Sequence, residues 1–233
     1  MTDSALRELA DDPSSRKRFF KMLGGAGAVS AATVLIAACG DDKKSATTTG
    51  AAASASSSDA DNASDLKIVN YALTLEYLEA TFYQEVLDSG VIKDKKIGDL
   101  AKALADTEQQ HVDALIATAK SLGGTPATKP KTKFQDTIAK GATTILMTAA
   151  TVENLGAAAY LGQAGNIKSK DILAAALSIH SVEARHAAAL NQLVGRGFGN
   201  GNGGLEGSLP DGPFGKPMDM AAVLKAVAPF IAS

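Results

Sequence analysis

Two stretches of the sequence have the spacing of helices that bind metal ions. Glu108 precedes His111 by three residues, and Glu183 precedes His186 by the same interval. Residues three apart lie on one face of an α-helix, so each pair would present a carboxylate beside an imidazole. If the two helices are neighbours, both pairs can contribute to one site.

An internal repeat adds two more glutamates to this pattern. The residues that recur at a constant offset of 77 are Thr74 and Thr151, Glu76 and Glu153, Leu78 and Leu155, and Tyr83 and Tyr160. Those that recur at an offset of 75 are Glu108 and Glu183, His111 and His186, Ala114 and Ala189, and Leu115 and Leu190. The chain is therefore two copies of a helix pair, each with one Glu on its first helix and one Glu-x-x-His on its second.

The repeated residues make a set of four carboxylates and two imidazoles. Oxygen donors with borderline nitrogens suit a pair of divalent iron or manganese ions better than a soft metal. Four carboxylates also balance the charge of two divalent ions, whereas without metal the converging acids would repel one another and take up protons. The alternative is a set of buried salt bridges and core histidines, but Lys and Arg are missing from the faces that would pair with them, apart from Arg185, which the helical wheel turns away.

The elements that position these residues are expected to be long helices, because apolar residues recur at helical spacing from Asp65 onward. Gly and Pro at the breaks predict helices over residues 65–89, 98–122, 134–165 and 169–194, with a short fifth over 219–231. Each long helix has roughly 25 residues, or about 37 Å, which favours an all-α bundle. There is no strand signal. The four repeated glutamates lie in the middle parts of their helices and can meet at one level.

These motifs resemble the ferritin-like superfamily of di-iron and di-manganese carboxylate proteins over residues 65–194. The resemblance implies a four-helix bundle with a long crossover between its second and third helices, and residues 123–133 could reach roughly 36 Å across the bundle. The metal ligands it implies are Glu76, Glu108, His111, Glu153, Glu183 and His186. The stretches Leu73–Tyr83 and Val182–Leu190 look most like the desiccation-related branch of the superfamily.

The function implied by the resemblance is that of a di-iron oxidoreductase of the ferroxidase or peroxidase type. Two Fe ions would be the cofactors, and Glu108 and Glu183 would bridge them because they share helices with the two His. O2 or peroxide would be the oxidant. Two alternatives stay open: a dimanganese catalase that disproportionates peroxide, and a non-catalytic stress-related protein in which metal only braces the bundle. Bulk iron storage is disfavoured, although the chain could form a small homo-oligomer.

Four further residues near these motifs have a functional and a structural interpretation. Tyr83 and Tyr160 sit seven residues after Glu76 and Glu153 and could act in catalysis, by hydrogen-bonding the ligands or giving up an electron, or could be core aromatics. Glu79 is either a carboxylate near the metals or a solvated one, and we favour the solvated interpretation. His180 is expected to be an ordinary surface or core histidine.

The N-terminus is expected to direct export. A basic cluster over residues 16–21 precedes an apolar stretch over 22–38 and the single Cys39. This resembles a bacterial lipoprotein signal whose cysteine is lipidated, and residues 15–21 also resemble a twin-arginine motif, with Lys17 in place of an arginine. The implied location is the cell envelope, with a lipid anchor in the membrane. A single transmembrane anchor is the alternative.

The remaining segments and the composition limit other functions. Residues 40–64 are rich in Ser, Ala and Thr and are expected to be a disordered linker, while 195–233 form a Gly-rich tail with the short helix. The single Cys excludes disulfides and cysteine-based metal sites. A net charge of −2 gives no basic excess for binding nucleic acid.

Overall fold

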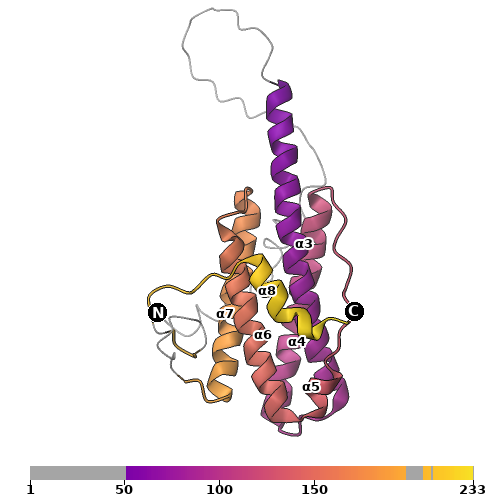
Figure 1. Ribbon diagram of the computed structural model, residues 1–233, viewed down its shortest axis with the longest axis vertical. Helices are drawn as coiled ribbons and strands as arrows, with labels where there is room; N and C mark the ends of the chain where they lie inside the picture. Colours follow the sequence, from indigo (N-terminus) through magenta and orange to yellow (C-terminus); the bar gives the residue numbers. More distant parts are fainter. Residues whose placement is uncertain (1–50, 198–206, 211, 233) are drawn as a thin grey trace, which may run out of the picture.

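The structure is a computed structural model that describes residues 51–197, 207–210 and 212–232 (Figure 1). Most of the described residues are helical. The helices are α3 (Ala51–Ser89), α4 (Lys95–Ser121), α5 (Gln135–Ala139), α6 (Ala142–Ala164), α7 (Lys170–Leu193), α8 (Met220–Val227) and a 3₁₀ turn η1 (Ala228–Phe230). An isolated β-bridge pairs Thr132 with Ile231, and the described residues contain no β-strand. The expected all-α class is confirmed.

Local sequence signals account for the ends of several helices. Asp94, Ser169 and Asp219 cap α4, α7 and α8, because each side chain accepts a hydrogen bond from a backbone N–H in the first turn. Gly90 follows α3 with a φ of 61°, a left-handed conformation that glycine adopts without strain. These caps fix where the long helices begin and end.

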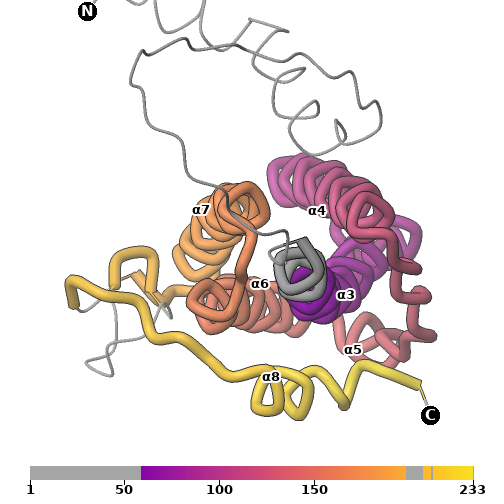
Figure 2. Tube along the Cα trace, turned by 90° about the horizontal axis from the view of Figure 1, so that it is seen from above, coloured from indigo at the N-terminus to yellow at the C-terminus, as the bar shows by residue number. Residues whose placement is uncertain are grey.

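The four long helices form a bundle of two antiparallel pairs (Figure 2). Helix α3 packs mainly against α4, and α6 packs mainly against α7. The pairs meet through α3 with α6 and α4 with α7. The segment between α4 and α5 runs back along the outside of the bundle (Figure 1). This is the long crossover of the ferritin-like arrangement.

Two helix boundaries differ from the sequence prediction. Helix α3 begins at Ala51 and not at residue 65, so residues 51–64 continue a helix where a linker was expected. No Gly or Pro interrupts residues 51–89, and adding a residue to an existing helix costs far less than starting one. The predicted third helix is broken between α5 and α6 at Gly141, whose φ of 92° is incompatible with a continuous helix.

The apolar core is divided into two clusters along the bundle axis. On α4, Leu104 belongs to one cluster and Val112 to the other. The C-terminal helix α8, as expected from the sequence, packs on the first cluster through Val223 and Val227. On α4, Glu108 lies between residues of the two clusters, and on α7 Glu183 lies between Ile179 of one and Leu190 of the other.

The N-terminal predictions lie outside the described residues. These are the export signal ending at Cys39 and the first part of the linker, over residues 40–50. Part of the Gly-rich tail, residues 198–206 and 211, also lies outside them. Among the described helices, none is both long and apolar enough to cross a membrane.

Candidate metal centre

Four glutamates from four helices meet in the middle of the bundle, with no solvent exposure. Glu76 comes from α3, Glu108 from α4, Glu153 from α6 and Glu183 from α7. The structure thus brings together one carboxylate from each long helix, as the repeat predicts. Buried carboxylates are rare unless they are paired or bind a metal.

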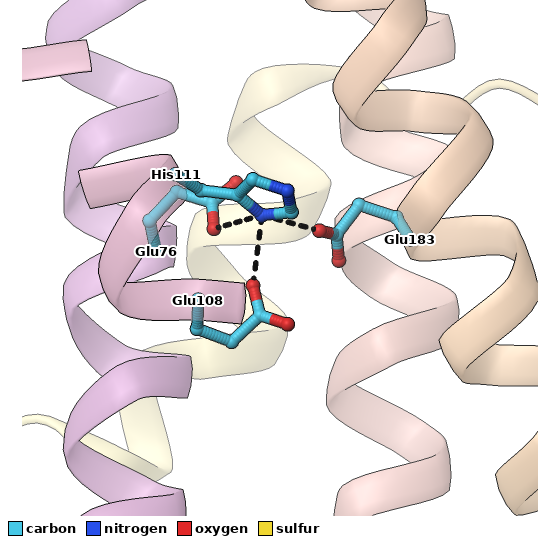
Figure 3. A group of neighbouring side chains, drawn as sticks. All are labelled: Glu76, Glu108, His111 and Glu183. Atoms are coloured by element: carbon cyan, nitrogen blue, oxygen red, sulfur yellow. Dashed lines mark hydrogen bonds and ion pairs between the residues drawn. The ribbon is translucent and has the colours of Figure 1, made fainter. Parts of the chain in front are cut away.

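The first half of the centre surrounds His111 (Figure 3). Its Nδ1 atom lies 3.2 Å from Glu76 Oε2, 3.0 Å from Glu108 Oε2 and 3.0 Å from Glu183 Oε1. Three carboxylate oxygens from three helices therefore converge on one imidazole nitrogen. The four residues offer ligand atoms that all lie within 4.8 Å of one another, close enough to surround one ion.

The second half repeats this arrangement around His186. Its Nδ1 atom lies 2.8 Å from Glu108 Oε1 and 3.3 Å from Glu153 Oε2. With Glu183, these residues make a second group whose ligand atoms lie within 4.8 Å of one another. The bundle therefore contains two overlapping donor sets, each with one His and three Glu.

Glu108 and Glu183 belong to both donor sets. The two oxygens of Glu108 face different imidazoles, with Oε2 near His111 and Oε1 near His186. A carboxylate placed in this way can bridge two ions. Bridging roles were suggested for these two residues from the sequence, while Glu76 and Glu153 each belong to one set only.

Several buried polar atoms of the centre lack a hydrogen-bond partner. Among the described residues, these include both carboxylate oxygens of Glu183, Glu108 Oε1, Glu153 Oε2 and His186 Nδ1. The short distances at His186 thus lack hydrogen-bond geometry. Leaving such atoms unsatisfied costs about 1–3 kcal/mol each, and more for charged groups. Metal ions would satisfy them, so the residues present fit a pair of hard or borderline divalent ions.

Burial and mutual repulsion change the acidity of these groups. Burial, followed by the nearby carboxylates, raises the pKa of Glu183 well above its usual value. Burial also raises the pKa of Glu108, to about 7, against the opposing effect of the two His. Burial alone would lower the pKa of His186, but Glu108 and Glu153 outweigh it and raise the pKa to about 9. The centre therefore holds protons that metal ions would displace.

Two buried tyrosines orient Glu76 and Glu153, the glutamates that each belong to only one donor set. Tyr83 Oη donates a 2.5 Å hydrogen bond to Glu153 Oε1, and Tyr160 Oη donates one of 2.5 Å to Glu76 Oε1. Burial raises the pKa of both phenols, so they remain neutral donors. Each tyrosine thus fixes a glutamate on the other repeat, which places both beside the centre.

The interpretation of Glu79 as solvated is wrong, because its side chain is only 4% exposed. It lies beside Glu183, against Gly156 of α6. The sequence did carry a signal, since Glu79 follows Glu76 by three residues on the same helix face. His180 is only partly exposed and its Nδ1 lies 3.0 Å from the carbonyl oxygen of Ala157, so it takes no part in the cluster.

Comparison with known proteins agrees with this geometry. A family model described as a ferritin-like domain matches residues 64–196, which is more than half of the chain and includes α4, α6, α7 and most of α3. None of the curated proteins compared with the chain matches it. The matched range contains the two donor sets and both tyrosines. The chain therefore belongs to the ferritin-like domain family.

Proposed function

We propose that the protein binds two Fe(II) ions in the centre and oxidises them with O2 or peroxide. The observation that carries this proposal is the sharing of Glu108 and Glu183 between two otherwise separate donor sets. Two sets that share two carboxylates hold two ions close together. A pair of ferrous ions at this place supplies the electrons for reduction of the oxidant.

The residues of the centre support this role in three ways. Four carboxylates offset the charge of two divalent ions, so that the loaded site is close to neutral in a buried environment. The hydrogen bonds from Tyr83 and Tyr160 leave one oxygen of each acceptor glutamate directed at the site. The apolar clusters on both sides exclude bulk water from the reacting ions.

A small apolar cavity next to the centre suits the oxidant. Its wall includes Leu75, which precedes Glu76 in the sequence, and Tyr160, whose hydroxyl group donates a hydrogen bond to Glu76. The lining is almost entirely aliphatic or aromatic. Cavities of this kind stay dry and bind small apolar molecules, so this one could hold O2 within reach of the ions.

The test loads the purified full chain with Fe(II) without oxygen and then adds O2. The proposal expects about two Fe per chain, O2 uptake and the absorbance of Fe(III). A Glu153→Ala variant should lose oxidation, whereas Glu85→Gln, on the outer face of α3, should keep it. No bound metal, or bound Fe(II) that O2 does not oxidise, would reject the proposal.

The same experiment with Mn(II) tests the catalase alternative, because the donor set suits both metals. A dimanganese catalase would evolve O2 from peroxide, whereas a ferroxidase consumes O2. A protein in which metal only braces the bundle would do neither. In that last case Glu153→Ala would cost stability and nothing else.

We further propose that the protein is exported and anchored in the cell envelope through a lipid on Cys39. The basic cluster, the apolar stretch and the position of the single cysteine support this. Helix α3 extends beyond the other helices at its N-terminal end (Figure 1). An anchor there would hold the bundle away from the membrane surface.

A further inference from the structure

Glu79 is a fifth buried carboxylate beside the two donor sets. It lies on α3, three residues after Glu76, and its Oε2 atom has no hydrogen-bond partner. Burial and then the charge of Glu183 raise its pKa well above the usual value. Glu79 belongs to neither donor set, and its buried oxygen without a partner needs an explanation that the six repeated residues do not supply.

The repeat breaks its symmetry at this position. Gly156 occupies the place in α6 that Glu79 occupies in α3, at the same offset of 77 residues. A Cβ atom on Gly156 would lie 2.9 Å from Glu79 Oε1 and 3.0 Å from Glu183 Oε2. The absence of a side chain at Gly156 therefore leaves the space that the Glu79 carboxylate fills. Glu79 Oε1 and Glu183 Oε2 both lie at this space.

Glu79 also lies on the side of the centre away from the imidazoles. His111 and His186 come from α4 and α7, which form one side of the bundle (Figure 2). Glu79 comes from α3 and reaches α6, which form the other side. The six repeated residues leave this side without a nitrogen ligand.

We propose that Glu79 is a seventh protein ligand of the metal pair, bound on the side opposite the two imidazoles. This rests on the proposed function, since it requires that the centre binds metal. Glu79 makes the two halves unequal, because its counterpart Gly156 offers no donor. It also brings the carboxylate charge to −5, which leaves a net −1 with two divalent ions and +1 with two trivalent ions. The extra charge favours the oxidised pair.

The test uses Co(II) as the probe, because its visible absorption reports the number and type of ligands. The purified full chain is titrated with Co(II), and the bound metal is counted by equilibrium dialysis. The variants are Glu79→Gln, which keeps the size of the side chain, and Glu85→Gln, the same change on the same helix. The Glu85 carboxylate accepts hydrogen bonds from Thr132 and Gln135 outside the centre, so its variant serves as the matched control.

The expected result is that Glu79→Gln weakens one of the two Co(II) sites by at least tenfold and changes the visible spectrum. Glu85→Gln should match the wild type in both measurements. Two Co(II) bound by Glu79→Gln with wild-type affinity and spectrum would overturn the inference and leave the proposed function standing. A wild-type protein that binds no metal would overturn both.

Two further variants keep the test decisive if Glu79→Gln does not fold. Gly156→Ala retains every carboxylate, but its methyl group would lie 2.9 Å from Glu79 Oε1 and 3.0 Å from Glu183 Oε2, so it should displace both and weaken both Co(II) sites. Glu79→Asp keeps the charge on a shorter side chain and should give an intermediate affinity. Wild-type affinity and spectrum in both would contradict the proposed ligand.

Discussion

Tyr160 on α6 donates a 2.5 Å hydrogen bond to Glu76 on α3, although the two residues are 84 positions apart in the sequence. Tyr83 and Glu153 make the corresponding bond in the opposite direction, from α3 to α6. The two repeats are thus joined at the centre by a reciprocal pair of phenol–carboxylate contacts. Each phenol acts on one donor set, because its acceptor glutamate belongs to that set alone.

Replacing Tyr160 by Phe should weaken the donor set that contains His111 and leave the other set nearly unchanged. Without its donor, Glu76 Oε1 is buried and unpaired, and partners of this kind typically contribute about ten- to a hundredfold to metal affinity. Tyr83→Phe should have the same effect on the set with His186. Metal titration of both variants checks this.

A result in which both Tyr→Phe variants keep full affinity but lose the rate of Fe(II) oxidation would contradict this orienting role. It would instead assign the phenols to electron transfer. Tyr77→Phe is a suitable control, because Tyr77 lies on the same helix but is not part of the centre.

Replacing a glutamate that belongs to both donor sets should lower the number of bound ions more than replacing one that belongs to a single set. Glu108→Gln takes an oxygen from both donor sets, so we expect less than one ion per chain. Glu153→Gln affects only the set with His186, so we expect about one ion to remain. Elemental analysis after dialysis distinguishes the two. Equal losses in both variants would show that Glu108 does not bridge.

The centre could be predicted from the sequence because its residues follow a short-range spacing that occurs in both repeats. The spacing in Glu-x-x-His fixes two donors on one helix face, and the repeat identifies Glu76 and Glu153 as the remaining carboxylates. Their pairing across the bundle follows from the position of each residue along its helix. The six residues come together because they lie at the same height along the bundle axis.

Glu79 was misjudged because its environment depends on a residue on another helix. Its spacing from Glu76 placed it on the ligand face, but its burial also requires the absence of a side chain at Gly156 on α6, which no pattern within α3 reveals. The start of α3 was misjudged for a different reason. Residues 51–64 contain no large apolar residue, but adding residues to an existing helix costs far less than starting one.

Replacing Cys39 by Ser should release the protein from the membrane fraction, if the lipoprotein signal functions as proposed. A lipid chain on the cysteine supplies the membrane affinity, and serine accepts no thioether-linked lipid. Cell fractionation and labelling with a fatty-acid analogue check this. Membrane attachment of unlabelled Cys39→Ser would contradict the lipid anchor and favour the transmembrane alternative.

Asp65 should contribute to the stability of the bundle but not to its metal affinity. It is 1% exposed, and its two oxygens accept 2.8 Å hydrogen bonds from the backbone of Lys168 and Ser169, which precede α7. Asp65→Ala leaves both N–H groups unpaired, and we expect a loss of roughly 2–4 kcal/mol in the free energy of unfolding. Urea denaturation measures it.

The matched control for Asp65→Ala is Asp99→Ala. Asp99 forms an exposed pair with Lys95, and such pairs contribute about 1 kcal/mol or less. Similar losses in the two variants would contradict the structural role of Asp65. Weaker metal binding by Asp65→Ala in its folded state would show that the α6–α7 connection also positions the ligands.

The metal-free protein should become less stable as the pH rises from about 4.5 to about 9. The pKa of Glu108 is raised from 4.5 to about 7, and that of His186 from 6.5 to about 9, so the folded state holds protons that the unfolded chain releases. Each retained proton lowers the free energy of unfolding by up to about 1.4 kcal/mol per pH unit within its window. The pKa of Glu76 is lowered, because His111 outweighs the effect of burial. Its titration therefore changes the stability only below about pH 4.5.

Metal ions should remove most of this pH dependence, because they replace the protons and compensate the same carboxylates. Urea denaturation between pH 5 and 9, with EDTA and with bound metal, compares the two forms. Glu108→Gln cannot take up the proton, so its metal-free form should show a shallower decline up to about pH 7. A metal-free wild type whose stability rises with pH over this range would contradict the raised pKa values of Glu108 and His186, and with them the burial and the neighbouring charges that cause them.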